Sequence, residues 1–120
     1  KPSTSKGFYT GQTCSSMNID HLVSLKDAYD SGADKWGAKK KMVFGNDREN
    51  HAPSCSRVNS SKGSAGPRDF LRRSSDRKGT DYQIIRFCEY VARYYSIKRK
   101  YGLSFASNSK RIFADCGINL

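Results

Sequence analysis

Two adjacent residues near the start of the chain, Asp20 and His21, carry side chains suited to metal and acid–base chemistry. They belong to an apolar run that predicts a strand from Ile19 to Val23. Neighbouring side chains of a strand point to opposite faces, so the pair can divide two tasks. Asp20 would hold a metal ion, while His21 would take a proton from water. In isolation the same pair is also typical of a solvated turn or a hydrogen-bonded pair without catalytic function.

The charge balance of the chain indicates a polyanionic partner. Its 120 residues include 22 Lys and Arg against 11 Asp and Glu, a net charge of +11. This exceeds what solubility requires, and nucleic acid bound through its phosphates is the first candidate. A membrane surface or a sulfated polysaccharide would satisfy the same charge. No apolar run approaches the roughly 20 residues of a spanning helix, and the length fits one domain over residues 1–120. We expect a monomer.

The chain has four cysteines, Cys14, Cys55, Cys88 and Cys116. Their spacing matches neither the Cys-x-x-Cys pairs of a zinc site nor a redox motif, so two disulfides and an extracellular location are predicted. We interpret the polar, flexible residues 1–7 as the start of a mature secreted product. Four free thiols in a cytosolic protein are the alternative.

Several further elements are predicted around the Asp-His pair. Ser24 and Asp27 resemble a capping box that begins a helix ending at Gly32. Trp36 is expected in the core, before a second helix over 38–44. The remaining expected elements are a strand over 8–14, a loop over 45–53, a strand over 54–58, a helix opening at Asn59, and a basic helical piece over 68–73.

The clearest helix signal lies in the C-terminal third. A capping box at Thr80 opens it, Gly102 ends it, and basic residues precede that end. Its expected apolar face contains Ile84, Cys88, Val91 and Tyr95. A last helix is predicted over 107–116. Three disulfide connectivities are allowed, and we choose Cys14–Cys55 and Cys88–Cys116 because these pairs join elements that the expected fold places side by side.

Asp20-His21 on one strand, Asn50 in a loop, and Asn59 at the start of a helix after a second strand follow the order of a ββα-metal finger. The segments 20–33, 46–50 and 58–63 resemble the His-Asn-His (HNH) superfamily of endonucleases, in a branch whose third position is Asn. The resemblance covers residues 18–70. It implies an α+β fold in which a small finger is braced by C-terminal helices over 80–120.

The resemblance also implies an activity: hydrolysis of phosphodiester bonds with one Mg²⁺ or Mn²⁺ ion. Cleavage without sequence specificity is expected from the charge, which indicates binding through phosphates, and from the lack of a recognition helix or zinc finger that would read base edges. Asp20 and Asn59 would bind the ion, because hard oxygen ligands suit it. His21 would be the general base, and Asn50 would hold the loop in shape. Lys62 is our first choice for stabilising the transition state. DNA is the expected substrate, with RNA left open.

Basic residues near the motif are expected to bind phosphate, namely Arg48, Arg57, Lys62 and Arg68. A basic face around Arg86, Arg93 and Lys98 would extend this track. The run Lys39-Lys40-Lys41 is either a solvated helix face or a further phosphate contact. His51 is either an alternative metal ligand or a surface residue.

One alternative function is a non-catalytic, disulfide-stabilised basic protein that binds nucleic acid, heparin or membranes in defence. Its charge and cysteines would be the same, but it would not need Asp20, His21 and Asn59. Asn59 also begins the one Asn-x-Ser/Thr sequon of the chain, and a glycan there would exclude a metal site. The sequence does not reveal whether an inhibitor protein exists.

Overall fold

Two short antiparallel strands, β1 (Met17–His21) and β2 (His51–Cys55), pair over their full length, with Asp20 opposite Ala52 and His21 opposite His51. The computed structural model describes residues 5–70, 84–105 and 110–120. Between the strands lie helices α1 (Leu25–Asp30) and α2 (Ala38–Gly45), and the 3-10 turns η1 (Ala33–Lys35) and η2 (Arg48–Asn50). Helix α3 (Ser56–Lys62) follows β2 directly. The order strand, strand, helix that the resemblance requires is therefore present, and the fold is α+β as predicted.

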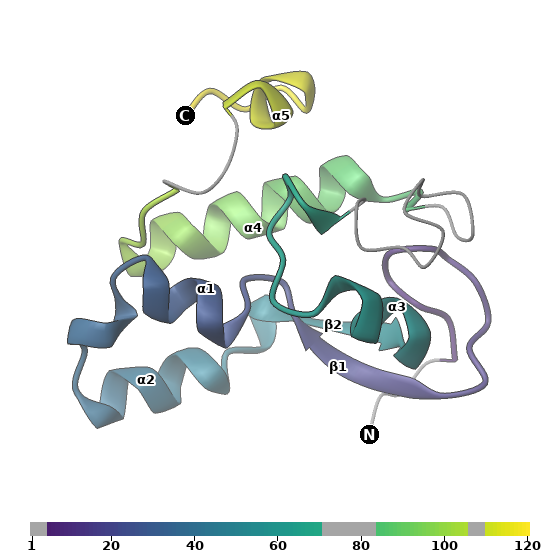
Figure 1. Cartoon of the computed structure of the whole chain (residues 1–120), viewed down its shortest axis with the longest axis horizontal. Coiled ribbons are helices and arrows are strands. Elements are labelled where there is room, and N and C mark those ends of the chain that lie inside the picture. Colours follow the sequence, from purple (N-terminus) through teal and green to yellow (C-terminus); the bar gives the residue numbers. More distant parts are fainter. Residues whose placement is uncertain (1–4, 71–83, 106–109) are drawn as a thin grey trace.

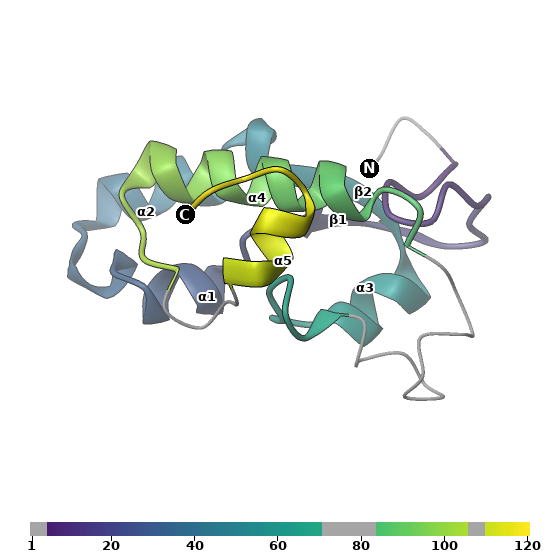
Figure 2. The ribbon, with the colours of Figure 1, turned by 90° about the horizontal axis from the view of Figure 1, so that it is seen from above.

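Helix α4 (Phe87–Tyr101) is the long brace of the molecule. It runs past α1 and α2 at one end and towards the paired strands at the other, and α5 (Lys110–Asp115) lies on its far side (Figure 1, Figure 2). Tyr90, Val91, Tyr94 and Ile97 of α4 are buried. None of the helices within the described ranges has the length and apolar character needed to cross a membrane.

An aromatic cluster joins the N-terminal segment, the segment after α3, and α4. The rings of Tyr9, Phe70 and Tyr90 meet edge to face, with centroids 5.0 to 5.6 Å apart. All three side chains are fully buried or nearly so. Edge-to-face pairs of this kind add to the burial energy of the rings. The cluster fixes Tyr9 beside β1, where its hydroxyl becomes part of the candidate site.

A buried ion pair joins α1 to α4. The Ser24 hydroxyl caps α1 by accepting a bond from the Asp27 amide, as predicted. The Asp27 carboxylate binds Lys98 Nζ at 2.7 Å and also accepts a bond from the Tyr94 hydroxyl. Lys98 is fully buried, and burial lowers its pKa although the bond to Asp27 opposes that shift. The prediction that Lys98 belongs to an exposed phosphate track is therefore wrong.

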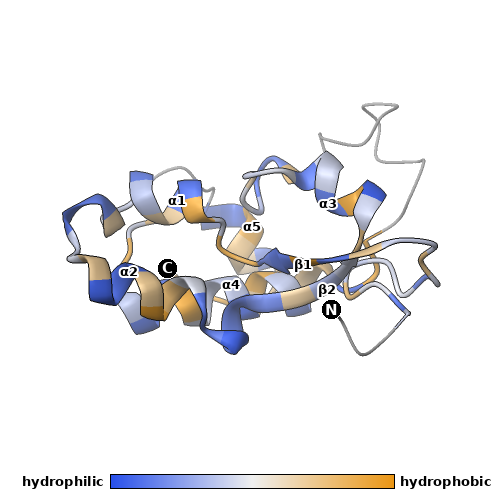
Figure 3. Cartoon of the chain, turned by 90° about the horizontal axis from the view of Figure 1, so that it is seen from below, coloured by the Kyte–Doolittle hydropathy of each residue, from blue (hydrophilic) through white to orange (hydrophobic). Residues whose placement is uncertain are grey.

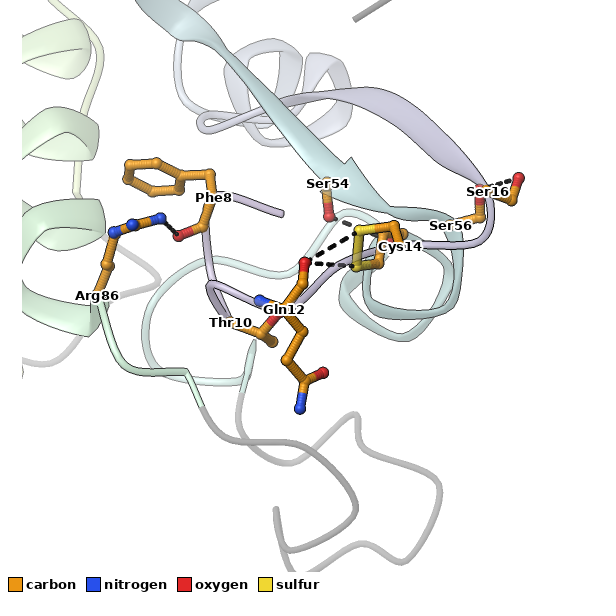
Figure 4. Close-up of a disulfide and its surroundings, with 9 residues drawn as sticks. Phe8, Thr10, Gln12, Cys14, Ser16, Ser54, Ser56 and Arg86 are labelled. Carbon is orange, nitrogen blue, oxygen red and sulfur yellow. Dashed lines mark hydrogen bonds between the residues drawn. A yellow bond between two sulfur atoms is a disulfide. The ribbon is translucent and has the colours of Figure 1, made fainter. Parts of the chain in front are cut away.

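Both predicted disulfides are present, Cys14–Cys55 and Cys88–Cys116. The first ties the segment before β1 to the last residue of β2 (Figure 4). In the same view Arg86 reaches from the start of α4 to donate a 2.7 Å bond to the Phe8 carbonyl. The second disulfide attaches α5 to the first turn of α4.

Several predicted boundaries are wrong. Residues 8–14 form turns and a single bridge between Lys6 and Thr13, because Gly7 and Gly11 close a loop there. β2 and α3 both begin three residues earlier than expected. Helix α4 begins at Phe87, and its buried face is rotated towards the tyrosines, leaving Cys88 and Ala92 exposed. Residues 1–4, residues 71–73, the capping box at 80–83, and residues 107–109 lie outside the described ranges.

Candidate functional site

Asp20 and His21 face opposite sides of the sheet, as a strand requires. Asp20 is buried towards α3 and the aromatic cluster, whereas His21 is only partly buried and turns towards the end of α2. Two neighbouring residues therefore enter two different environments. One holds a carboxylate in the interior, and the other leaves an imidazole within reach of solvent.

Among the residues that the structure describes, two groups hold the Asp20 carboxylate, and both contact its Oδ2 atom. The Tyr9 hydroxyl donates a hydrogen bond to it, and Lys62 Nζ lies 3.2 Å away. Burial and then the Asp20 charge raise the pKa of Tyr9 well above its usual value, so this hydroxyl keeps its proton and remains a donor. Asp20 is thus the anionic centre of a buried three-residue cluster.

Lys62 connects the helix of the finger to its first strand. The side chain is fully buried in α3, and its ammonium also donates a 3.1 Å bond to the His21 carbonyl. A buried ammonium is stable only when such partners compensate for its lost hydration. Because Lys62 binds both Asp20 and the His21 backbone, its observed role is to position the two residues of the motif.

His21 is held by one ring nitrogen. Its Nε2 lies 2.9 Å from the Gly45 carbonyl oxygen at the end of α2. A carbonyl can only accept, so Nε2 carries the proton, and in the neutral ring Nδ1 has the free lone pair. His51 Nε2 lies 3.0 Å from the same carbonyl, and the two rings meet edge to face at 4.8 Å. The geometry leaves His21 able to accept a proton at Nδ1.

Asn50 fixes the chain around the motif. It is fully buried; its Oδ1 accepts a 2.8 Å bond from the Val23 amide and its Nδ2 donates a 2.9 Å bond to the Val23 carbonyl. Its own carbonyl accepts from the Leu22 amide at 2.8 Å. One side chain therefore completes the backbone bonding of the residues that leave β1. This is the loop-holding position that the resemblance implies for Asn50.

Asn59 lies within α3, one turn before Lys62 and half-buried, rather than at the start of the helix. Residues three apart on a helix share a face, so its amide belongs to the side of α3 that carries Lys62. Among the described residues, no group of three or more His, Cys, Asp or Glu comes together as a metal site. The donors offered are one carboxylate and one amide.

This donor set fits a weakly held magnesium ion rather than an ion in a closed protein cage. Mg²⁺ keeps several waters and is commonly bound through one or two carboxylates together with substrate phosphates. The Tyr9 and Lys62 contacts to Asp20 are both made at Oδ2, so a cation bound here would meet Oδ1. The Lys62 charge already offsets part of the Asp20 charge, which weakens binding in the absence of phosphate.

The basic residues near the motif divide into two groups. Arg48, Arg57 and Arg68 are exposed, and Arg68 pairs with Asp69 at 3.2 Å. Arg93 instead donates to the backbone carbonyls of Glu49 and His51, bracing the start of β2 from α4. The first group lies at the surface, where phosphate can approach, while Arg86 and Arg93 have structural contacts.

Two contributors to the site had no local sequence signal. Tyr9 lies in a turn far from the motif, and only the tertiary fold brings its hydroxyl to Asp20. The Gly45 carbonyl is a backbone group. His51 lies opposite His21 in the register of β1 and β2. The sequence did not predict this pair, because the second strand was expected to begin at residue 54.

An uncharacterized secreted protein of Arthroderma benhamiae is 31% identical to this chain over 107 residues. The match covers 85% of this chain and 48% of that protein, so the chain spans about half the length of its relative. No family model matches the chain, and no solved structure matches it. Together with the two disulfides, the relative identifies this chain as secreted and extracellular.

Proposed function

We propose that the chain is a secreted, sequence-non-specific, metal-dependent endonuclease that hydrolyses the phosphodiester bonds of DNA, with RNA as a second substrate class to test. The observation that carries the proposal is the His21–Gly45 hydrogen bond on a β-β-α frame. It fixes the protonated nitrogen of the ring and frees Nδ1, one residue from a buried carboxylate.

The proposed reaction uses the chain's own groups as follows. His21 Nδ1 takes a proton from a water molecule, and the Gly45 carbonyl stabilises the resulting imidazolium through Nε2–H. The water oxygen bonds to phosphorus, the P–O bond to the leaving sugar oxygen breaks, and that oxygen is protonated from solvent. Asp20 and Asn59 would hold the divalent ion, whose charge would offset that of the phosphate oxygens.

Binding would rely on charge rather than on base sequence. The net charge of +11 and the exposed Arg48, Arg57 and Arg68 support attraction to a phosphate backbone. Affinity should therefore fall steeply as salt is raised. Lys62 acts in this proposal as a positioning residue, because it is fully buried against Asp20.

The test is plasmid cleavage by wild type, His21→Ala and His51→Gln proteins, each with Mg²⁺ and with EDTA. We expect cleavage by wild type only with Mg²⁺, and a loss of about 10²- to 10⁴-fold in His21→Ala with plasmid binding retained. His51→Gln is the matched control: the glutamine amide can still donate to the Gly45 carbonyl, so the His21 contact should persist and the variant should cleave at close to the wild-type rate. Cleavage by His21→Ala at the wild-type rate would contradict the proposal.

The second candidate is a non-catalytic basic binding protein, and the Asp20–Lys62 ion pair favours it. A carboxylate already neutralised by a buried lysine can have a purely structural role. A binder would retard the plasmid on a gel in EDTA and in Mg²⁺ alike, and no protein in the series would cleave it. That result would replace the nuclease with the binder.

A further inference from the structure

A pocket of about 270 Å³ opens between α1 and α2, beside the candidate site. Pockets that hold drug-sized ligands measure ~300–1,000 Å³. The smaller volume of this pocket suits one planar group. Apolar, aromatic and basic residues line it, among them Leu25, Tyr29, Trp36, Lys41, Phe44 and Gly45.

The pocket is apolar, yet its walls are open to solvent. Leu25 and Tyr29, the two pocket residues on the outer side of α1, are 56% and 57% exposed. Figure 3 shows apolar and polar positions interleaved along both helices. Trp36 is half-buried and packs on Phe44 and Tyr101, so its ring is held in place. Apolar side chains gathered in this way are typical of a binding surface.

Lysines are concentrated in η1 and α2, and one of them, Lys41, lines the pocket. Lys35, Lys39, Lys40 and Lys41 are all exposed, and Lys40 Nζ lies over the Trp36 ring, 4.5 Å from its centre, in a cation–π contact that a stacking base would displace. Fixed aromatic rings bordered by cations are the combination with which proteins bind single-stranded nucleic acid, where bases stack on the rings and the backbone follows the charge. The same lysines oppose a second copy of this basic chain as the occupant.

One residue joins the pocket to the motif. Gly45 lines the pocket, and its carbonyl is the group that accepts from His21 Nε2 at 2.9 Å. A base held between α1 and α2 would thus lie beside Gly45, the residue whose carbonyl holds the proposed general base.

We propose that the α1/α2 pocket binds an unpaired nucleobase next to the cleaved phosphate, and that the chain therefore prefers single-stranded nucleic acid. This inference rests on the proposed function and adds a substrate preference to it. A base within a duplex is stacked on both sides and cannot enter the pocket without leaving the helix. Base identity is not read, because stacking accepts every base.

Trp36 makes the test direct, since it is the one tryptophan of the chain. Its fluorescence would be followed in EDTA while three ligands of equal length are added: a single-stranded oligonucleotide, the same oligonucleotide made abasic, and a duplex. We expect saturable quenching by the first and little change with the other two. Equal quenching by the abasic strand would overturn the proposal, because phosphate alone would then account for binding.

Two variants separate the pocket from general charge effects. Tyr29→Ala should weaken single-strand binding about tenfold, whereas Ile85→Ser, at an apolar side chain 63% exposed just before α4, should leave it unchanged. Equal effects of the two substitutions would refute the pocket. So would a Trp36 signal that changes with protein concentration alone, which would indicate self-association.

These measurements also keep the two proposals distinct, because quenching is measured without metal. Base-dependent quenching in a protein that never cleaves DNA with Mg²⁺ would support the pocket and defeat the nuclease. Cleavage of single and double strands at equal rates, with Trp36 unaffected, would support the nuclease and defeat the pocket.

Discussion

Lys62 Nζ lies 3.2 Å from Asp20 Oδ2, and neither side chain has appreciable contact with solvent. The finger is therefore held together by an ion pair that spans β1 and α3. Such a pair stabilises a fold less than its geometry suggests, but removing one member leaves a buried charge without a partner.

Replacing Lys62 by Met should lower the free energy of unfolding by about 3–5 kcal/mol, since the buried Asp20 carboxylate would lose its cationic partner. Urea denaturation measures this. The control is Lys26→Met, which breaks an exposed pair with Asp30 and should leave the urea midpoint nearly unchanged. If Lys62→Met lowers the free energy of unfolding as little as Lys26→Met does, the buried pair does not form in solution.

Asn50→Ala should cost about 2–4 kcal/mol, because it strips hydrogen bonds from both the amide and the carbonyl of Val23. Asn46→Ala, at an exposed position a few residues earlier, should change stability by less than about 0.5 kcal/mol. Thermal unfolding of the two variants checks the difference. Similar melting temperatures would mean that the Asn50 amide does not hold the loop.

Stability should also fall in acid through Asp47. Burial alone would raise the pKa of this carboxyl, but hydrogen bonds from Lys100 and Tyr101 outweigh that effect and lower its pKa to about 2. A carboxyl with a lowered folded-state pKa stabilises fully above its ordinary value and loses the contribution as pH falls through about 2.

The expected contribution of Asp47 is roughly 1–2 kcal/mol, because Lys100 is half-exposed and solvent screens the interaction. Unfolding measured from pH 6 to pH 2 should show a shallower acid decline in Asp47→Asn than in wild type. Asp30→Asn, at an exposed carboxylate, is the control and should keep the wild-type slope. Parallel curves for Asp47→Asn and wild type would contradict this account.

Removing the Cys88–Cys116 disulfide should release α5 without disturbing the finger. The six-residue helix is too short to be stable alone, and the bridge across 28 residues contributes roughly 3–4 kcal/mol in the chain-entropy view. Hydrogen exchange in the double Cys→Ala variant should show lost protection in α5 and retained protection in β1 and β2. Loss of protection in both would mean that α5 also supports the sheet.

Local patterns predicted the local features well. The Ser24 cap and the extent of α2 depend on residues close together in sequence, whereas the loop predicted over 45–53 contains η2 and the first residues of β2. The two disulfides are predictable because each joins elements that the expected fold already placed side by side. The cap and the helix need little knowledge of the tertiary fold, whereas the choice of disulfides depended on the expected fold itself.

Features set by tertiary contact could not be predicted in the same way. Asp27 completes only half of a capping box, because its carboxylate binds Lys98 and Tyr94 of a distant helix. The buried face of α4 contains Val91 as expected, together with Tyr90 and Tyr94. The expected apolar face did not include these two tyrosines. Tyr9 and Lys62 are polar side chains that can be buried because each binds Asp20, and both lie far from it in sequence.

The separation of β1 from β2 also governs how the protein must fold. The strands are not a hairpin, since α1, η1, α2 and η2 all lie between them. Closing the sheet orders this whole segment before the strand contacts compensate for the lost entropy, so strand pairing should be late and slow compared with helix formation. In refolding followed by stopped-flow, helical signal should precede burial of the strands. We therefore expect the helices to form before the sheet when the chain folds in the secretory pathway.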